Sequence, residues 1–165
     1  MPTSVELLIP EFGAEMASTR RVLAAVPDAK FDWKPHEKSM SIGSLASHLA
    51  ELPWFGTTIL TTPELDFAAN PYTSRNLPTT AARLESFDKL AGEMRSLIER
   101  ADWATLQDTW KLRMGDHVLL DAPKGTLLRT LTIAHMSHHR AQLSVYLRLR
   151  GVAVPGSYGP SADEM

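Results

Sequence analysis

Hydrophobic residues recur at helical spacing in four long segments of the chain, which are separated by polar stretches containing proline or glycine. Apolar residues three and four positions apart lie on one face of an α-helix, so each stripe predicts an amphipathic helix. The predicted helices cover Ser4–Val26, Ser41–Leu60, Thr80–Arg100 and Thr126–Arg150. Pro53 falls inside the second helix and should kink it, because proline lacks a backbone N–H and its ring clashes with the preceding turn.

The segments between these helices differ in length and pattern. Thr61–Thr79 is polar and too long for a tight turn, so we expect a crossover connection there. Between the third and fourth helices, Gly115 and Asp116 separate two apolar-alternating runs, which favours a short hairpin of Trp110–Met114 with His117–Leu120. The pattern predicts an all-α protein, a four-helix bundle with one long crossover and a short hairpin before the last helix.

Length and composition bound the class of protein. A chain of 165 residues with 44% hydrophobic residues is expected to form one globular domain over residues 1–165. Its formal net charge of -2 gives no general attraction to nucleic acid or to anionic membranes. The chain has neither an apolar run of about 20 residues that could span a bilayer nor an N-terminal secretory signal. We therefore expect a cytoplasmic protein with neither nucleic acid nor membrane as partner.

Three histidines carry the clearest chemical signal. His135 and His139 are four residues apart on a predicted helix, so their rings point the same way and can reach one cation. His48 lies on the inward stripe of the second helix. Burying such rings without partners would cost roughly 1–3 kcal/mol each, and a shared cation removes this cost for all three. The alternative is a metal-free helical interaction module in which hydrogen bonds satisfy these histidines.

The predicted site is therefore a divalent metal ion bound by His48, His135 and His139. The chain has no cysteine, so only nitrogen and oxygen ligands are available, and imidazole nitrogen suits zinc, nickel and iron alike. Three protein ligands leave a coordination position open, as in catalytic sites.

Several other residues are candidates for roles around this site. His138, Arg140 and Gln142 neighbour the ligand pair and could hydrogen-bond to the ligands or hold an anionic group of a substrate. Glu51, one turn from His48, is the candidate carboxylate for a ligand N–H. The polar C-terminal tail is either a loose terminus or folds back through Tyr158.

The histidines, the run from His135 to Leu143 and the tail sequence PGSYGPSADE together resemble the DinB/YfiT-like superfamily. The resemblance covers nearly the whole chain, including the block DWKPHEKSMSIGSLASHLAEL that ends just after His48. It implies a four-helix bundle in which His48, His135 and His139 bind a divalent metal ion, often within a homodimer. Relatives include thiol-dependent S-transferases and a maleylpyruvate isomerase, which use low-molecular-weight thiols such as bacillithiol or mycothiol.

We therefore expect a metal-dependent enzyme that activates a thiol or water for transfer to, or hydrolysis of, a small electrophilic substrate. The implied partners are a small-molecule substrate and a low-molecular-weight thiol. A metal-binding, stress-related protein without turnover is the alternative. No motif identifies catalytic residues beyond the metal ligands, and none identifies the substrate.

Overall fold

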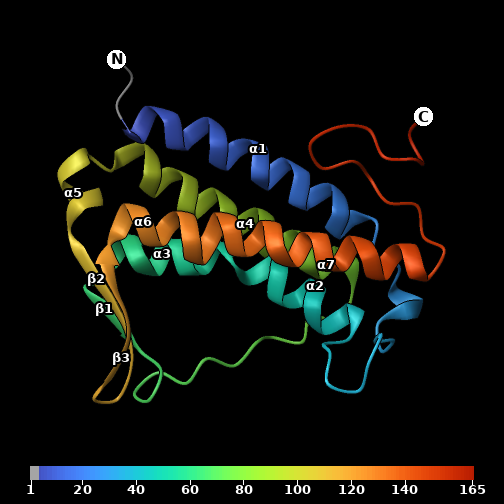
Figure 1. Cartoon of the computed structure of the whole chain (residues 1–165), viewed down its shortest axis with the longest axis horizontal. Helices are drawn as coiled ribbons and strands as arrows, with labels where there is room; N and C mark the ends of the chain where they lie inside the picture. The colour runs from blue at the N-terminus through green and yellow to red at the C-terminus, as the bar shows by residue number, and fades with distance from the viewer. Residues whose placement is uncertain (1–3) are drawn as a thin grey trace.

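The computed structural model describes residues 4–165, in which long helices run side by side and a small sheet lies at one end (Figure 1). The helical layer consists of α1 (Ser4–Ala24), α2 (Ile42–Glu51), α3 (Pro53–Thr61), α4 (Thr80–Arg100) and α7 (His135–Leu149). In this layer α4 contacts α1, α2 and α3, while α7 contacts α1 and α2. Their apolar faces form a connected core that includes Leu23, Leu49, Phe87, Met94 and Leu143.

The second predicted helix is divided at Pro53 into α2 and α3. Proline is favourable in the first turn of a helix, where its missing N–H would have no intrahelical acceptor. Leu52 joins the two helices, and Ser41 caps the start of α2 by accepting a hydrogen bond from the backbone N–H of Ser44. The division lets α2 pack against α7 while α3 packs against α6 (Lys124–Leu128).

The fourth predicted helix is also interrupted. It begins at Lys124, two residues before the prediction, and contains the π-helical turn η2 (Arg129–Ala134) between α6 and α7. In this turn the backbone N–H of His135 donates to the carbonyl of Thr130, five residues back instead of four. The wider turn rotates all of α7, and thus His135 and His139, relative to α6.

The expectation of an all-α four-helix bundle is wrong, because a three-stranded mixed sheet packs at one end of the helices (Figure 1). The strands are β1 (Glu64–Asp66), β2 (Thr109–Met114) and β3 (His117–Pro123). β1 pairs with β2 in parallel, and β2 pairs with β3 antiparallel. The predicted hairpin is therefore present and longer than expected, whereas β1 lies in the stretch predicted to be a crossover.

Polar contacts hold β1 in the sheet, which explains why hydrophobic patterning missed it. Arg113 on β2 pairs with Glu64 at 2.6 Å and with Asp66 at 3.3 Å. Asp66 also accepts the backbone N–H of Gly115 at 2.9 Å, in a turn where this glycine has a φ of 58°. A short helix that was also not predicted, α5 (Trp103–Gln107), precedes β2.

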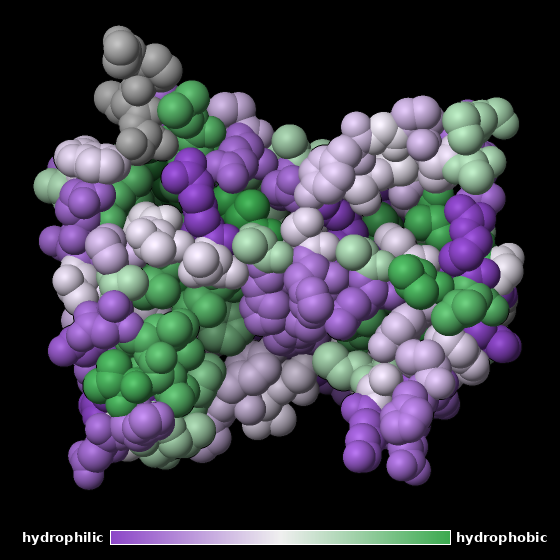
Figure 2. All heavy atoms as spheres, in the orientation of Figure 1, coloured by the Kyte–Doolittle hydropathy of each residue, from purple (hydrophilic) through white to green (hydrophobic). Residues whose placement is uncertain are grey.

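Exposed apolar side chains of the hairpin gather at the sheet end of the molecule (Figure 2). They are Met114, Val118, Leu119 and Leu120. None of the helices in residues 4–165 is both long enough and apolar enough to cross a membrane.

The C-terminal tail folds back along α1 and α7. Of the two alternatives for the tail, the one in which it folds back through Tyr158 is therefore confirmed. The Tyr158 hydroxyl accepts a hydrogen bond from Arg140 Nη2 at 2.6 Å and lies 2.9 Å from Ser137 Oγ. Nearer the end of the chain, Arg148 on α7 pairs with Asp163 at 2.6 Å. These contacts attach the tail to the helical layer at two points.

Candidate metal centre

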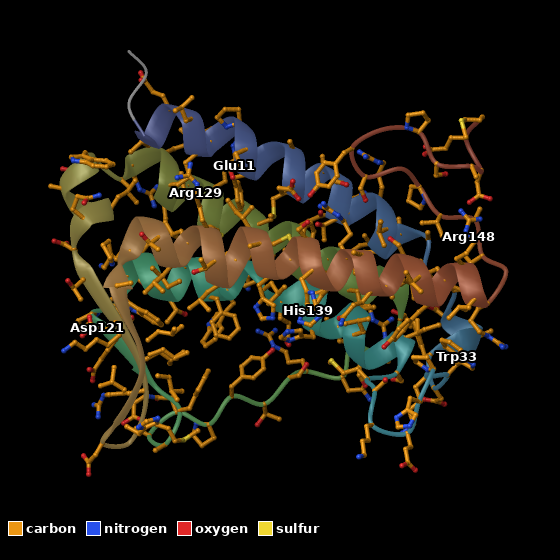
Figure 3. All side chains as sticks on the ribbon, in the orientation of Figure 1. Glu11, Trp33, Asp121, Arg129, His139 and Arg148 are labelled. Carbon is orange, nitrogen blue, oxygen red and sulfur yellow. The ribbon has the colours of Figure 1, made fainter. Side chains whose placement is uncertain are left out.

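The three predicted histidines meet between α2 and α7. His139 lies on the side of α7 that faces α2 and the connection from β1 to α4 (Figure 3). The Nε2 atoms of His135 and His139 are 2.8 Å apart, and the His48 ring centroid lies 5.3 Å and 4.8 Å from theirs. One potential ligand atom from each residue lies within 4.8 Å of the other two. Two separate helices therefore bring the three imidazoles together, the His135/His139 pair that the spacing predicted and His48 from the inward stripe of α2.

A hydrogen bond within α7 orients the His139 ring. His139 Nδ1 lies 2.7 Å from the side-chain oxygen of Gln142, which can only accept, so Nδ1 carries the proton and Nε2 a lone pair. Burial lowers the pKa of the His135 ring, and the backbone carbonyl of Leu131 beside the ring partly offsets this lowering. The two Nε2 atoms face each other across 2.8 Å, and a shared cation would need a lone pair on both.

His48 is oriented through a tyrosine. Its Nδ1 lies 3.2 Å from the Tyr72 hydroxyl, which donates to Glu51 Oε2 at 3.2 Å. In this arrangement His48 Nδ1–H donates to the tyrosine oxygen, leaving its Nε2 unprotonated. Glu51 is buried and also accepts from Ser74 Oγ and from the backbone N–H of Arg75. The carboxylate expected near His48 is thus present, but it acts through Tyr72.

Tyr72 was missed by the sequence analysis, because it lies in the stretch predicted to be a polar crossover. The only signal for it is that Thr61–Thr79 contains two aromatic residues, Phe67 and Tyr72. The Trp54 ring stacks on Tyr72 with centroids 6.0 Å apart. A cavity of about 480 Å³ lies beside the hydrogen bonds that join His48, Tyr72 and Glu51. It is lined by Glu51, Trp54 and residues of the 69–75 segment, which include Tyr72.

The surroundings favour neutral imidazoles. Burial, together with the nearby His139 and His135 rings, lowers the pKa of His48 to about 4. Burial is also the largest cause of the lowered pKa values of His135 and His139. Burial and the adjacent Glu51 carboxylate raise the pKa of Tyr72 to about 12, so its hydroxyl stays protonated. Neutral imidazole is the form that ligates metals.

The other predicted residues lie in different places. His138 is exposed, with its ring 4.9 Å from that of His139, and lies outside the three-histidine group. Gln142 contacts His139 directly. Arg140, in contrast, is not brought to the cluster: it is buried on another side of α7, with Nη1 2.6 Å from a carboxylate oxygen of Glu15 on α1.

The sequence of this chain has relatives among known proteins. The model of the DinB family matches residues 1–165. The chain belongs to the DinB family. This DinB-family chain is 28% identical over 156 residues to the uncharacterized protein YrdA of Bacillus subtilis (strain 168), covering 93% of this chain and 86% of that protein.

Solved structures of DinB-like proteins share the fold. A DinB-like protein of Bacillus subtilis, YjoA, superposes with a TM-score of 0.70 at 18% identity, over 92% of this DinB-family chain and 97% of that one. A DinB-like protein of Bacillus cereus ATCC 10987 gives a TM-score of 0.64 at 20% identity, covering 88% and 92% of the two chains. At these identities the likeness extends to the fold alone.

Proposed function

We propose that His48, His135 and His139 bind a divalent metal ion, and that this DinB-family protein is a metal-dependent enzyme. The observation that carries the proposal is the convergence of three neutral imidazoles from α2 and α7 on one point. The donor set suits zinc, nickel or iron. Two ligand nitrogens of a tetrahedral zinc site lie about 3.3 Å apart. The potential ligand atoms of the three histidines already lie within 4.8 Å of one another, so small side-chain rotations would bring them to this spacing.

The proposed reaction is transfer of a thiol to, or hydrolysis of, a small electrophilic substrate. When bound, a divalent ion supplies Lewis acidity that lowers the pKa of a thiol or of water towards neutrality. The three histidines would hold the ion as its nitrogen ligands. Gln142 and Tyr72 keep the His139 and His48 rings in the required tautomers. Because the chain has no cysteine, a low-molecular-weight thiol would come from solution as a second substrate.

The first experiment tests metal binding with His139→Ala. Elemental analysis of untagged wild-type protein should give about one ion per chain, and H139A should lose it while its helical circular dichroism stays largely unchanged. His117→Ala on β3, an exposed histidine away from α2 and α7, is the matched control and should keep the metal. A fully metallated H139A variant would contradict the site.

The second experiment tests turnover. Metal-loaded wild-type protein is assayed with low-molecular-weight thiols and small electrophiles, alone and in combination. We expect turnover by wild type and H117A and none by H139A. Metal binding without any turnover would instead support the stress-related metal-binding role.

A further inference from the structure

Arg83, in the first turn of α4, is a buried cation outside the candidate metal centre. It is fully buried, and its guanidinium lies 3.7 Å from the ring centroid of Phe31. Nε donates to Ser47 Oγ at 3.2 Å and Nη2 to the Gly43 carbonyl at 3.4 Å. Nη1 has no hydrogen-bond partner within residues 4–165. One donor of a buried charged group is thus left unsatisfied.

Nor is this charge neutralised by an ion pair in the described part of the chain. The Asp28 carboxylate lies beyond ion-pair distance of Arg83 and raises its pKa. Burial lowers the pKa by more, so the net pKa of Arg83 is lowered. The Asp28 carboxylate is itself engaged by Thr80, whose N–H and hydroxyl donate to it at 2.8 Å and 2.9 Å. An uncompensated buried charge is unfavourable, which makes a bound counter-ion the natural completion of this site.

Arg83 lines a cavity of about 420 Å³ that could hold such an ion. Trp33, Ser41, Ser44, Asn76 and Arg150 contribute to the same wall. Ser44 Oγ accepts a hydrogen bond from Ser41 Oγ at 3.0 Å and so retains its own proton for donation. Trp33 lies at the end of the molecule where Arg148 is found, apart from His139 (Figure 3).

We propose that this cavity binds the carboxylate of a small organic monoanion, with Arg83 as its charge partner and Ser44 and Asn76 as further donors. Phe31 and Trp33 line the cavity, and we expect them to pack against the body of the ligand. Asp28 and Asp32 also line the cavity, and their charges oppose a dianion more strongly than a monoanion. The site is therefore expected to prefer a carboxylate to phosphate, independently of the metal centre.

The test is thermal unfolding of the full-length protein titrated with benzoate or inorganic phosphate at constant ionic strength. Benzoate at about ten times its Kd should raise the Tm of wild type saturably by about 3–6 °C, and phosphate should raise it less. Arg83→Met should abolish the benzoate effect. The matched control is Arg95→Met, an exposed residue of the same helix, which should respond as wild type does.

Arg83→Met is expected to fold, because apolar replacement of a buried charge is commonly tolerated. If it does not fold, Ser44→Ala tests the same cavity and should weaken benzoate binding about tenfold. The proposal is overturned by the absence of a saturable response in wild type, or by an undiminished response in R83M or, where that variant does not fold, in S44A. A phosphate response equal to or larger than that of benzoate would overturn the preference for monoanions.

Discussion

Tyr72 links the candidate metal centre to a buried carboxylate through a single hydroxyl group. Tyr72→Phe removes the acceptor of His48 Nδ1–H and one donor to Glu51. Removing a group that orients a metal-ligating histidine in this way typically lowers the metal affinity 10–100-fold. We expect Y72F to bind zinc about tenfold more weakly than wild type, measured by competition with a chelator of known affinity.

The matched control is Tyr146→Phe. Tyr146 lies on α7, and its ring packs edge-on against Trp33 with centroids 5.7 Å apart. Y146F should keep wild-type zinc affinity and, in the cobalt-substituted protein, the wild-type visible spectrum, which Y72F should alter. Equal affinities and spectra in all three proteins would show that Tyr72 does not orient His48.

Single residues differ in how far the sequence reveals their place. The proximity of His135 and His139 follows from their spacing on one helix, and the inward stripe of α2 indicates His48. The contact between His48 and Tyr72 joins residues 24 positions apart through a segment without periodicity, so no pattern predicts it. Arg140 follows His139 in sequence, yet successive helical residues point about 100° apart, and its side chain therefore faces α1.

At the scale of elements, a buried ion pair joins α7 to α1. Arg140 is 1% exposed and its partner Glu15 is 12% exposed, so both charges are largely removed from water. Glu15→Gln leaves the guanidinium without a counter-charge, which in buried pairs costs about 3–5 kcal/mol. We expect E15Q to lose about 3 kcal/mol of unfolding free energy in urea denaturation, with zinc affinity unchanged because Arg140 lies away from the histidines.

Glu11→Gln is the control for this pair. Glu11 on α1 pairs with Arg129 in η2 at 3.0 Å, but both side chains are about half exposed (Figure 3). Such surface pairs contribute about 0–1 kcal/mol, so E11Q should be close to wild type. Similar losses in E15Q and E11Q would contradict the role assigned to burial.

The elements themselves were predictable where local signals are strong. Thr80–Arg100 is helical over its predicted bounds, because the side chain of Thr79 caps its start and its apolar stripe is regular. The π-helical turn at Arg129–Ala134 has no proline or glycine to mark it, and only its tertiary packing distinguishes it from an α-helix. β1 is three residues long, too short for alternation, and depends on ion pairs from β2.

At the scale of the whole molecule, the buried histidines link folding to pH. An unfolded histidine has a pKa near 6.5, whereas that of His48 in the folded protein is about 4. Between these values the unfolded chain binds more protons than the native state, so stability falls as pH falls. His135 and His139 act in the same direction. The metal-free protein should lose about 1–2 kcal/mol of unfolding free energy between pH 7 and pH 5, allowing for partial exposure.

Urea denaturation of chelator-treated protein at the two pH values measures this loss. His48→Asn should show a smaller pH dependence, and His117→Asn on β3 the wild-type one. Zinc-loaded protein should be more stable at pH 7 and lose more stability by pH 5, because protons then compete with the ion for the same nitrogens. The burial of neutral imidazoles at this site would be contradicted if the unfolding free energy of the metal-free protein did not change between pH 7 and pH 5. It would also be contradicted if H48N showed the same pH dependence as wild type. The same three rings would thus oppose folding in acid without metal and stabilise the protein with it.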